Sequence, residues 1–475
     1  MSQLAGANGG RPQDVVERAL SLSKSDDCVV IADETSNANL RWAGNTLTTN
    51  GVARSRRLTV IAIDRHGDGA AAGVVSRAGV TDDQIEDVVR AAEKEAASSA
   101  PAEDAAPLPG PQETGAAGAG AGWSDAPERT GIGVLEGFAA QLGAALRAAG
   151  PAGQKLYGFA EHELTSTFLG SSSGLRLRHD QPTGKVELNA KSADLTRSAW
   201  AGEATRDFAG VDVDALAAGL TQRLDWARRK VELPAGRYET LLPPTAASDL
   251  LTYLYWSAGA KDAVDGRTVF SKPGGGTRVG EELSGQPVRL RSDPFAAGIG
   301  CSPFVVAHAS SRDSSVFDNG LPLGPTDWIS DGVLSALIQT RYSARLTGLP
   351  VTPAVDNLIF ETSAPEPPSL DEMIASTERG LLLTCLWYIR EVDPQTLLLT
   401  GLTRDGVYLI ENGRIQGAVN NFRFNESPID LLGRVSEVGR SEPILPREWS
   451  DYFTRASMPA IRVPDFNMST VSQAS

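Results

Sequence analysis

Histidines are the first residues to consider for hydrolytic or metal chemistry, and the chain has four: His66, His162, His179 and His308. No two are three or four residues apart, so no helix can present the imidazole pair that holds zinc in many peptidases. His162 lies between Glu161 and Glu163, and in a strand the two carboxylates would share the face opposite the imidazole. This pattern favours a solvated sheet edge over a catalytic site.

The three cysteines, Cys28, Cys301 and Cys385, are the next candidates. Cys301 and His308 could join Cys385 in a metal site, but such a site would be unusual and ordinary packing is favoured. Cys385 lies inside an apolar run, where a small buried hydrophobe is the favoured interpretation and a reactive thiolate the alternative. A serine nucleophile also stays open, although no Gly-x-Ser-x-Gly elbow supports it.

The overall composition limits the class of protein. The chain has 475 residues and a formal charge of −15, with 41% hydrophobic and 22% charged residues. These values predict a globular protein of two or three domains, and the negative charge argues against a nucleic-acid partner. The odd, scattered cysteines fit a reducing compartment. With no visible signal peptide and no run of about 18 apolar residues, we expect a cytoplasmic protein without a membrane span.

Residues 380–427 are the most informative stretch, because apolar runs alternate there with turn residues. Leu381–Ile389 suits a strand, and Asp405-Gly406 and Asn412-Gly413 suit tight hairpins because these pairs tolerate positive φ. The pattern predicts a meander of about four antiparallel strands, buried on at least one face. Polar residues at the strand ends are candidates for substrate or partner contact, with turn and edge chemistry as the equal alternative. They are Arg390, Glu391, Asn420, Asn421 and Arg423.

The N-terminal half alternates helical and antiparallel strand patterns. A helix at 12–23 precedes several short strands and a hairpin at 66–69, and a capping box at Thr81 opens a helix that runs to about Ala97. Residues 98–127 are rich in Ala, Gly and Pro and are expected to form an exposed, partly disordered linker or insertion.

The predicted fold class is α+β. Residues 12–97 and 128–231 form an N-terminal α+β region with antiparallel sheet and helices, and residues 232–466 form a larger β-rich domain. Further patterns predict a turn at 182–184, helices at 245–260 and 331–347, and irregular chain from Leu431 onward.

Several short segments resemble the C-terminal domain of the TldD/PmbA (TldE) family. They are FDNG at 317–320, ISDGVL at 329–334, YSA at 342–344, GLLL at 380–383, YLIENG at 408–413 and AVN at 418–420. The resemblance covers nearly the whole chain and is most specific from about Tyr238 onward. The stretch LWYIREVDPQTLLLTGLTRDG is similar to the actinobacterial branch of the family.

The resemblance implies a heterodimer in which a TldD-type subunit carries an HExxxH zinc motif. That motif lies on the helix after the first strand of the C-terminal domain, which corresponds here to residues 245–260. The segment has no histidine and no glutamate, and without imidazoles it cannot hold zinc to activate water. This chain therefore resembles the TldE/PmbA-type subunit, with no catalytic or metal residue and no cofactor of its own, and with zinc expected in the partner.

Complexes of this family are implied to hydrolyse unfolded peptides inside a closed chamber. The β-rich half of this chain would line the passage by strand addition, or would only support the catalytic subunit. Two other functions stay open: a self-sufficient hydrolase that uses Cys385 or a serine, and a scaffold homodimer.

Overall fold

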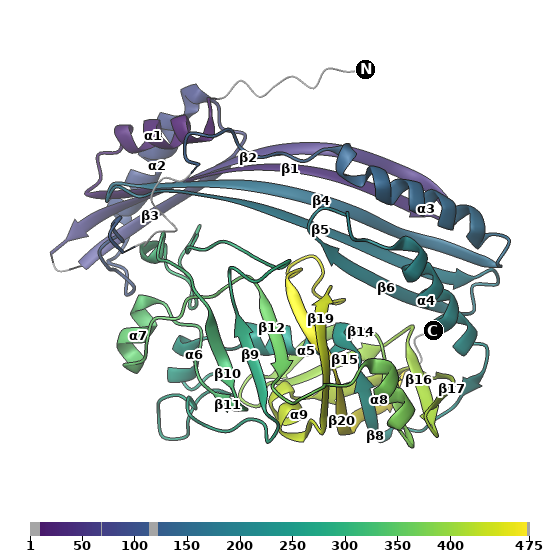
Figure 1. The fold of residues 1–475 in the computed structure, drawn as a ribbon. Coiled ribbons are helices and arrows are strands. Elements are labelled where there is room, and N and C mark those ends of the chain that lie inside the picture. The colour runs from purple at the N-terminus through teal and green to yellow at the C-terminus, as the bar shows by residue number, and fades with distance from the viewer. Residues whose placement is uncertain (1–9, 68, 114–121, 473–475) are drawn as a thin grey trace.

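The computed structural model describes residues 10–67, 69–113 and 122–472. An antiparallel sheet with helices, built from the N-terminal half, arches over a larger β-rich C-terminal domain (Figure 1). This arrangement confirms the α+β class predicted from the sequence. Asp68 of the expected hairpin and residues 114–121 of the expected linker lie outside the described residues.

In the described part of the chain, six strands form the N-terminal sheet in the order β3-β2-β1-β4-β5-β6. They are β1 (Asp27–Ala43), β2 (Thr46–His66), β3 (Gly69–Ala78), β4 (Gln154–Ser171), β5 (Arg176–Ser192) and β6 (Ser198–Thr205). All their pairings are antiparallel. Between β1 and β2, Gly44 and Asn45 both have positive φ (58° and 69°), as a tight hairpin requires.

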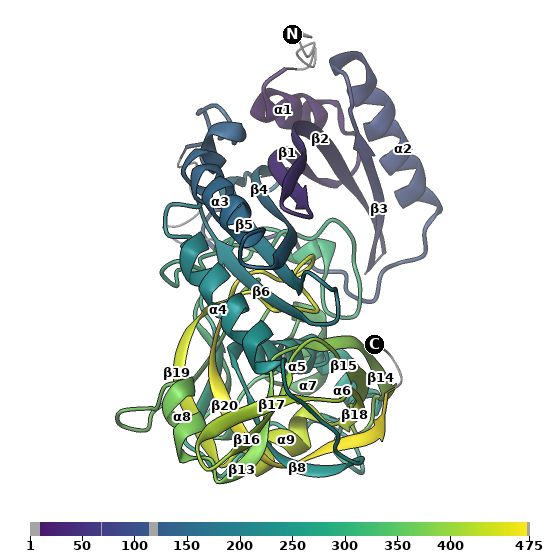
Figure 2. The ribbon, with the colours of Figure 1, turned by 90° about the vertical axis from the view of Figure 1, so that its right-hand side faces the viewer.

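Helices cover the outer face of this sheet at both ends, as Figures 1 and 2 show. They are α1 (Pro12–Leu22), α2 (Ile85–Ser98), α3 (Glu136–Ala149) and α4 (Val213–Trp226), with short 3-10 turns η1 (Asp82–Gln84) and η3 (Ile132–Leu135). α1 and α2 bury one apolar cluster against β1, β2 and β4, and α3 and α4 bury another against β1, β4, β5 and β6. The capping box of Thr81 and Gln84 is present as predicted.

Two N-terminal predictions differ from the structure. The turn expected at 182–184 is wrong, because β5 passes straight through it with Pro182 opposite Leu164 of β4. The described ends of the expected linker are packed against the sheet, Leu108 on the inner face and Trp123 on the outer face beside Phe168. Small and aromatic side chains at both described ends of this segment belong to the two apolar clusters. The sequence periodicity did not indicate this packing.

The inner face of the sheet packs on the C-terminal domain. Val29, Ile31 and Ile61 on this face form one apolar cluster with Phe304 and Phe317, which come from the loops of the lower layer. The cluster is fully buried at Ile31 and Phe317. Removing this apolar area from water is what holds the two layers together at that end.

The described C-terminal domain contains a mixed sheet of fourteen strands. Its strands are β7 (Lys230–Val231), β8 (Gly236–Leu242), β9 (Val288–Ser292), β10 (Thr326–Ser330), β11 (Val333–Leu334), β12 (Leu358–Thr362), β13 (Arg379–Leu383), β14 (Leu386–Asp393), β15 (Leu398–Thr403), β16 (Val407–Glu411), β17 (Arg414–Val419), β18 (Phe422–Glu426), β19 (Glu437–Ile444) and β20 (Ala456–Val471). Its helices are α5 (Pro244–Trp256), α6 (Ala260–Val264), α7 (Arg341–Thr347), α8 (Leu370–Ser376) and α9 (Pro428–Arg434), with a 3-10 turn η4 (Val316–Asp318).

Strand β20 connects most of this domain. It pairs with β8, β12, β18 and β19, so four neighbours depend on one strand near the end of the chain. The expectation of irregular chain from Leu431 is therefore wrong. Pro459 and Pro464 argued against a central strand, since proline lacks the N–H that a ladder needs, and the register of β20 is irregular where it pairs around these positions.

Two more C-terminal predictions are corrected. The helix expected at 331–347 exists only as α7, after the short strand β11. The run 381–389 is not one strand but parts of two, β13 and β14, which have different partners: β13 pairs with β8 and β16, and β14 pairs with β15. The strands expected at 380–427 are present, but they do not form a simple meander. No helix in the described ranges is both long and apolar enough to cross a membrane.

We predict that Gly73→Ala lowers the stability of the chain by about 2–4 kcal/mol. A Cβ at Gly73 in β3 would overlap the backbone of Ala92 and Ala96 in α2, so the helix would have to move off the sheet. Gly219→Ala in the middle of α4 is the matched control, because its Cβ would meet open space. It should stabilise by about 0.5–1 kcal/mol. Urea unfolding of both variants measures the difference, and equal effects would contradict the close packing of α2 on β3.

Candidate functional site

The segment predicted to be helical at 245–260 contains most of α5, and this helix is buried on nearly every side. It begins at Pro244, directly after β8, with proline in its first turn. Leu250, Leu251 and Leu254 belong to the main apolar cluster of the domain, and the helix packs against β20, β19, β8 and α9. A helix that is apolar all round belongs in a core.

Asp249 is the one acidic residue of α5, and its side chain is fully buried. Its Oδ1 accepts a hydrogen bond from the backbone N–H of Glu448 (2.9 Å), and its backbone oxygen accepts one from Nε1 of Trp449 (2.8 Å). Oδ2 has no partner among the described residues. Burial raises the pKa of Asp249 well above its ordinary value, because removal from water disfavours the charged form.

Glu448 connects this helix to β14. Its Oε1 accepts a hydrogen bond from the backbone N–H of Ile389 (3.1 Å) and lies 3.9 Å from Nη1 of Arg390. Burial raises the pKa of Glu448. Tyr388, which precedes Ile389 in β14, has a φ of +53° at an irregularity of the β14–β15 pairing. A bulky residue in this region stores strain on the order of 1–3 kcal/mol, which the contacts around it must offset.

The residue before Glu448, Arg447, contacts the N-terminal sheet through aromatic side chains. The guanidinium of Arg447 lies 3.0 Å from the centre of the Trp387 ring and 5.8 Å from the Trp200 ring of β6. Trp200, Cys385 and Leu445 form a small apolar cluster. We call the set of α5, β14, residues 445–450 and Trp200 the junction. It is a packed polar and aromatic contact between the two layers.

The five residues predicted from the sequence do not meet in one place. Arg390 and Arg423 are exposed and lie on either side of Thr400 of β15: Arg390 is its strand partner, and Nη1 of Arg423 donates to its Oγ1 (3.4 Å). Glu391 is exposed beside Arg390, and partial burial raises its pKa. These three share the surface of β14, β15 and β18.

The two predicted asparagines accept hydrogen bonds from the chain itself. Oδ1 of Asn420 accepts a hydrogen bond from the N–H of Leu233 (2.7 Å), at the boundary between the two domains. The backbone oxygen of Asn421 accepts one from the N–H of Ser472 (2.8 Å). Whether any of the five touches substrate or partner stays a prediction.

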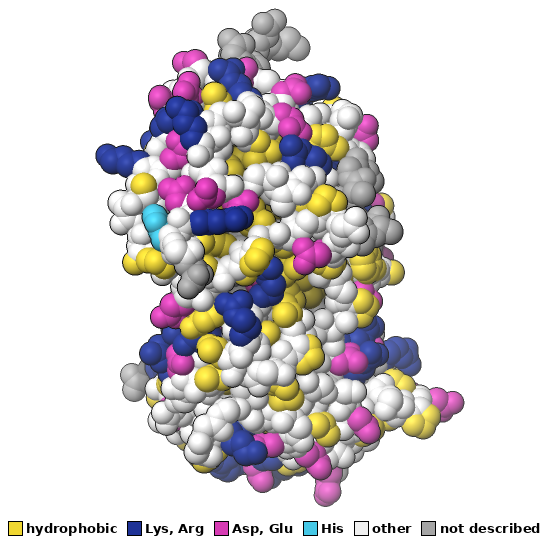
Figure 3. All heavy atoms as spheres, turned by 90° about the vertical axis from the view of Figure 1, so that its left-hand side faces the viewer, with side chains coloured by type: hydrophobic (Ala, Val, Ile, Leu, Met, Phe, Trp, Pro, Cys, Tyr) yellow, Lys and Arg dark blue, Asp and Glu magenta, His cyan; other side chains and the backbone are white. Residues whose placement is uncertain are grey.

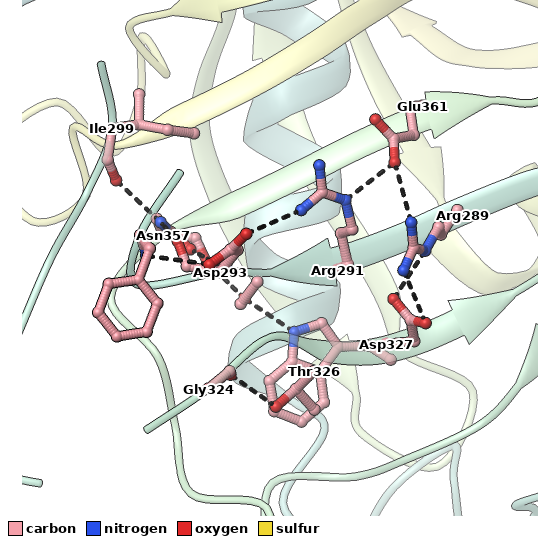
Figure 4. Close-up of polar contacts among 12 residues, drawn as sticks. Arg289, Arg291, Asp293, Ile299, Gly324, Thr326, Asp327, Asn357 and Glu361 are labelled. Atoms are coloured by element: carbon pink, nitrogen blue, oxygen red, sulfur yellow. Dashed lines mark hydrogen bonds and ion pairs between the residues drawn. The ribbon is translucent and has the colours of Figure 1, made fainter. Parts of the chain in front are cut away.

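The charged residues of β9, β10 and β12 pair with one another (Figure 4). Arg289 forms a two-pronged contact with Asp327 (2.7 and 2.9 Å), and Arg291 contacts Glu361 (2.9 Å). Beside them, Asn357 bonds to the backbone of Asp293. Because each charge has an opposite charge beside it, this ladder fixes the three strands and leaves no free charge for a ligand.

A cavity of about 320 Å³ lies beside the loops that contact the N-terminal sheet, lined in part by Val305, Asp313, Asp318 and Asp356. Asp318 and Asp356 are paired with Arg341 and Arg455. Oδ1 of Asp313 has no partner among the described residues, and burial raises the pKa of Asp313 to about 6. Figure 3 shows that basic and acidic side chains gather at the waist between the two layers.

Part of the chain matches the sequence model of a known family. Residues 235–470 match the sequence model of the PmbA/TldA metallopeptidase C-terminal domain. The chain belongs to the TldD/PmbA family. A comparison with curated proteins finds no match.

Solved structures share the fold of this TldD/PmbA chain over almost its whole length. TldE from Thermococcus kodakarensis has a TM-score of 0.76 at 16% identity, with 96% of this chain and 99% of that chain covered. A protein from Thermotoga maritima, described as a modulator of a DNA gyrase, has a TM-score of 0.76 at 17% identity, with 96% and 99% covered. A similar protein from Bacteroides thetaiotaomicron has a TM-score of 0.74 at 15% identity, with 97% and 99% covered.

The metallopeptidase name of the TldD/PmbA family implies zinc, so we tested whether α5 could hold it. Zinc needs three or four imidazole, thiolate or carboxylate donors. α5 offers only Asp249, whose burial opposes ionisation, and the carboxylate of Glu448 is engaged with β14. No group of three or more His, Cys, Asp or Glu in the described residues could hold a metal ion. The donor chemistry of α5 does not fit zinc.

The histidines of this TldD/PmbA chain have ordinary partners. Nδ1 of His162 contacts Oγ1 of Thr130 (2.8 Å), and its Nε2 contacts the carbonyl of Arg206 (2.8 Å). It is buried while Glu163 next to it is exposed, as the predicted alternation requires, but the predicted sheet edge is wrong because β4 lies between β1 and β5. His308 lies 3.1 Å from Oγ1 of Thr59 and 3.5 Å from Asp33.

Sequence reasoning missed Asp249, Arg447, Glu448 and Trp387, which build the junction. One signal was available: a lone acid within the apolar helix AASDLLTYLYW is uncommon unless the acid has a partner. Its partner lies 199 residues away along the chain, a separation that no periodic pattern reports.

We predict that Asp249→Asn leaves stability at neutral pH within about 1 kcal/mol of the parent, whereas Asp249→Ala costs about 2–4 kcal/mol. Asparagine keeps an oxygen for the N–H of Glu448 and carries no charge, while alanine leaves that N–H unpaired and opens a small void. Thermal unfolding at pH 7 compares the two. If both variants lost the same stability, Asp249 would have to be ionised in the folded chain.

We predict that Asp313→Asn stabilises the chain by roughly 1–2 kcal/mol at pH 7 and by less at pH 4. The pKa of Asp313 is raised from 3.8 to about 6 by burial, so the unfolded chain releases this proton at lower pH than the folded chain. The parent therefore loses stability as pH rises from about 4 to about 6. Denaturant unfolding at both pH values measures the difference, and a gain that does not change with pH would contradict this assignment.

Proposed function

We propose that this chain is the TldE-type subunit of a two-subunit peptidase, and that a TldD-type partner binds the zinc that cleaves the peptide. The observation that carries the proposal is the chemistry of α5. Its one acid is buried with a raised pKa, and the leucines and Tyr255 of the helix are buried as well. A helix of this kind supports a fold and cannot activate water through a metal.

In this proposal the chain contributes surface and support to the catalytic subunit, and unfolded peptides are the substrates. The exposed outer strands of the β-rich domain would hold an extended peptide by backbone hydrogen bonds, which suit many sequences. Arg390, Glu391 and Arg423 are the side chains that would meet the peptide or the partner, because they are exposed on neighbouring strands.

The state of the cysteines supports a reducing compartment, and with it the cytoplasmic location that we propose. All three are free and buried. Burial raises the pKa of Cys385 to about 11 and that of Cys28 to about 11, so neither thiol ionises readily. This chemistry disfavours a hydrolase that would use Cys385 as its nucleophile.

We predict that the purified chain alone hydrolyses no unfolded peptide, and that a mixture with a TldD-type protein from the same genome does. The expected complex contains both chains, with about one zinc for each pair. Peptide cleavage, measured by mass spectrometry together with metal analysis of the separated chains, tests this. Cleavage or stoichiometric zinc in this chain alone would overturn the proposal.

Cys385→Ala is the control for the alternative nucleophile. It should leave the activity of the mixture unchanged and lower the stability of this chain by about 1–2 kcal/mol, because only packing is lost. Complete loss of turnover with normal complex formation would favour the cysteine mechanism instead.

A further inference from the structure

The outer edge of β2 is a long strand edge without a partner in the described residues. β2 runs from Thr46 to His66, but β3 pairs only with its second half, from Arg57 to His66. Along Thr46–Ser55, β2 bonds to β1 on one side only. No described residue bonds to the backbone groups on the other side. Figure 1 shows β2 along the rim of the arched sheet.

This edge lacks the features that protect strand edges in monomeric proteins. Thr46–Ala53 contains no charged residue and no proline, and nearly all its side chains are exposed. Leu47 is 51% exposed and Val52 is 39% exposed. A long, uncharged edge with exposed apolar side chains favours pairing with another strand.

The charges on the edge determine which pairing is possible. The exposed Arg54 and Arg57 lie at one end, Arg56 between them is paired with Glu34 of β1, and no acidic residue occurs between Thr46 and Ile63. Two identical edges that pair in antiparallel fashion place the uncharged end of each against the arginine end of the other. Around a two-fold axis near Gly51, the two Arg54 residues are about 20 Å apart, which exceeds the screening length of about 8–10 Å. Parallel pairing would bring all these arginines together.

We propose that the Thr46–Ser55 edge of β2 pairs antiparallel with the same edge of a second copy of this chain. The two N-terminal sheets then join into one continuous sheet across a two-fold axis, an arrangement in which the same surface serves both copies. The edge is complementary to itself because its charge is confined to one end. This inference does not depend on the proposed peptidase role, since it concerns the chain alone.

The test is the association of the purified full-length chain, measured by sedimentation equilibrium. The expected result is a species of twice the mass of the chain. Leu47→Lys should raise the dissociation constant about tenfold or more, because each new lysine faces the arginine end of the other copy and the contact occurs twice. Leu47→Glu should keep or lower the dissociation constant, and added salt should then weaken the dimer.

Matched controls are Phe295→Lys and Phe295→Glu, since Phe295 is 63% exposed on the C-terminal domain. Neither should change the association. A chain that stays monomeric at every concentration would overturn the proposal. A dimer whose dissociation constant neither substitution at Leu47 changes would also overturn it. An equal rise of the dissociation constant for Leu47→Lys and Leu47→Glu would also overturn it. That result would show that Leu47 makes only an apolar contact and that the arginine end of the other copy does not face it. A failure to assemble with any TldD-type protein would leave this result standing.

Discussion

The burial of α5 is the constraint on which the rest of the C-terminal domain depends. Four elements pack against this helix, so a charge placed on it must be neutralised or paired. Asp249 meets this condition by favouring the protonated form and by accepting the N–H of Glu448. Glu448 itself contacts β14, and Arg447, the residue before it, reaches Trp200 of the N-terminal sheet. One buried acid thereby positions a contact between the two layers.

The junction gives the proposed subunit role a physical basis. The junction consists of aromatic rings, an arginine stacked on Trp387 and apolar side chains. These groups exclude water and hold the sheet against the lower domain. The exposed polar residues lie instead on β14 and β18, on the outer surface. The two roles meet on β14, where Nη1 of the exposed Arg390 lies 3.9 Å from Oε1 of Glu448 in the junction.

Local patterns predicted local structure well. The outer helices, the capping box at Thr81 and the strands between 380 and 427 follow from periodicity and turn chemistry. Long-range structure did not follow. The helix expected at 331–347 is mostly strand and loop, because Trp328 and its neighbours pack into the core cluster instead. β20 contains two prolines, and one of its partners, β8, lies more than 200 residues earlier in the chain. For the site, no pattern in the sequence indicated the carboxylates of the junction, because their partners come from distant segments.

The position of β20 at the end of the chain has a consequence for biosynthesis. The lower domain cannot close until residues 456–471 have left the ribosome, whereas the six upper strands are complete once Thr205 has emerged. The arched sheet can therefore form during translation, while the apolar cluster of the incomplete lower domain is still exposed to water. In that interval the nascent chain exposes β8 and β12 as unpaired edges, and chaperones would find their binding sites there.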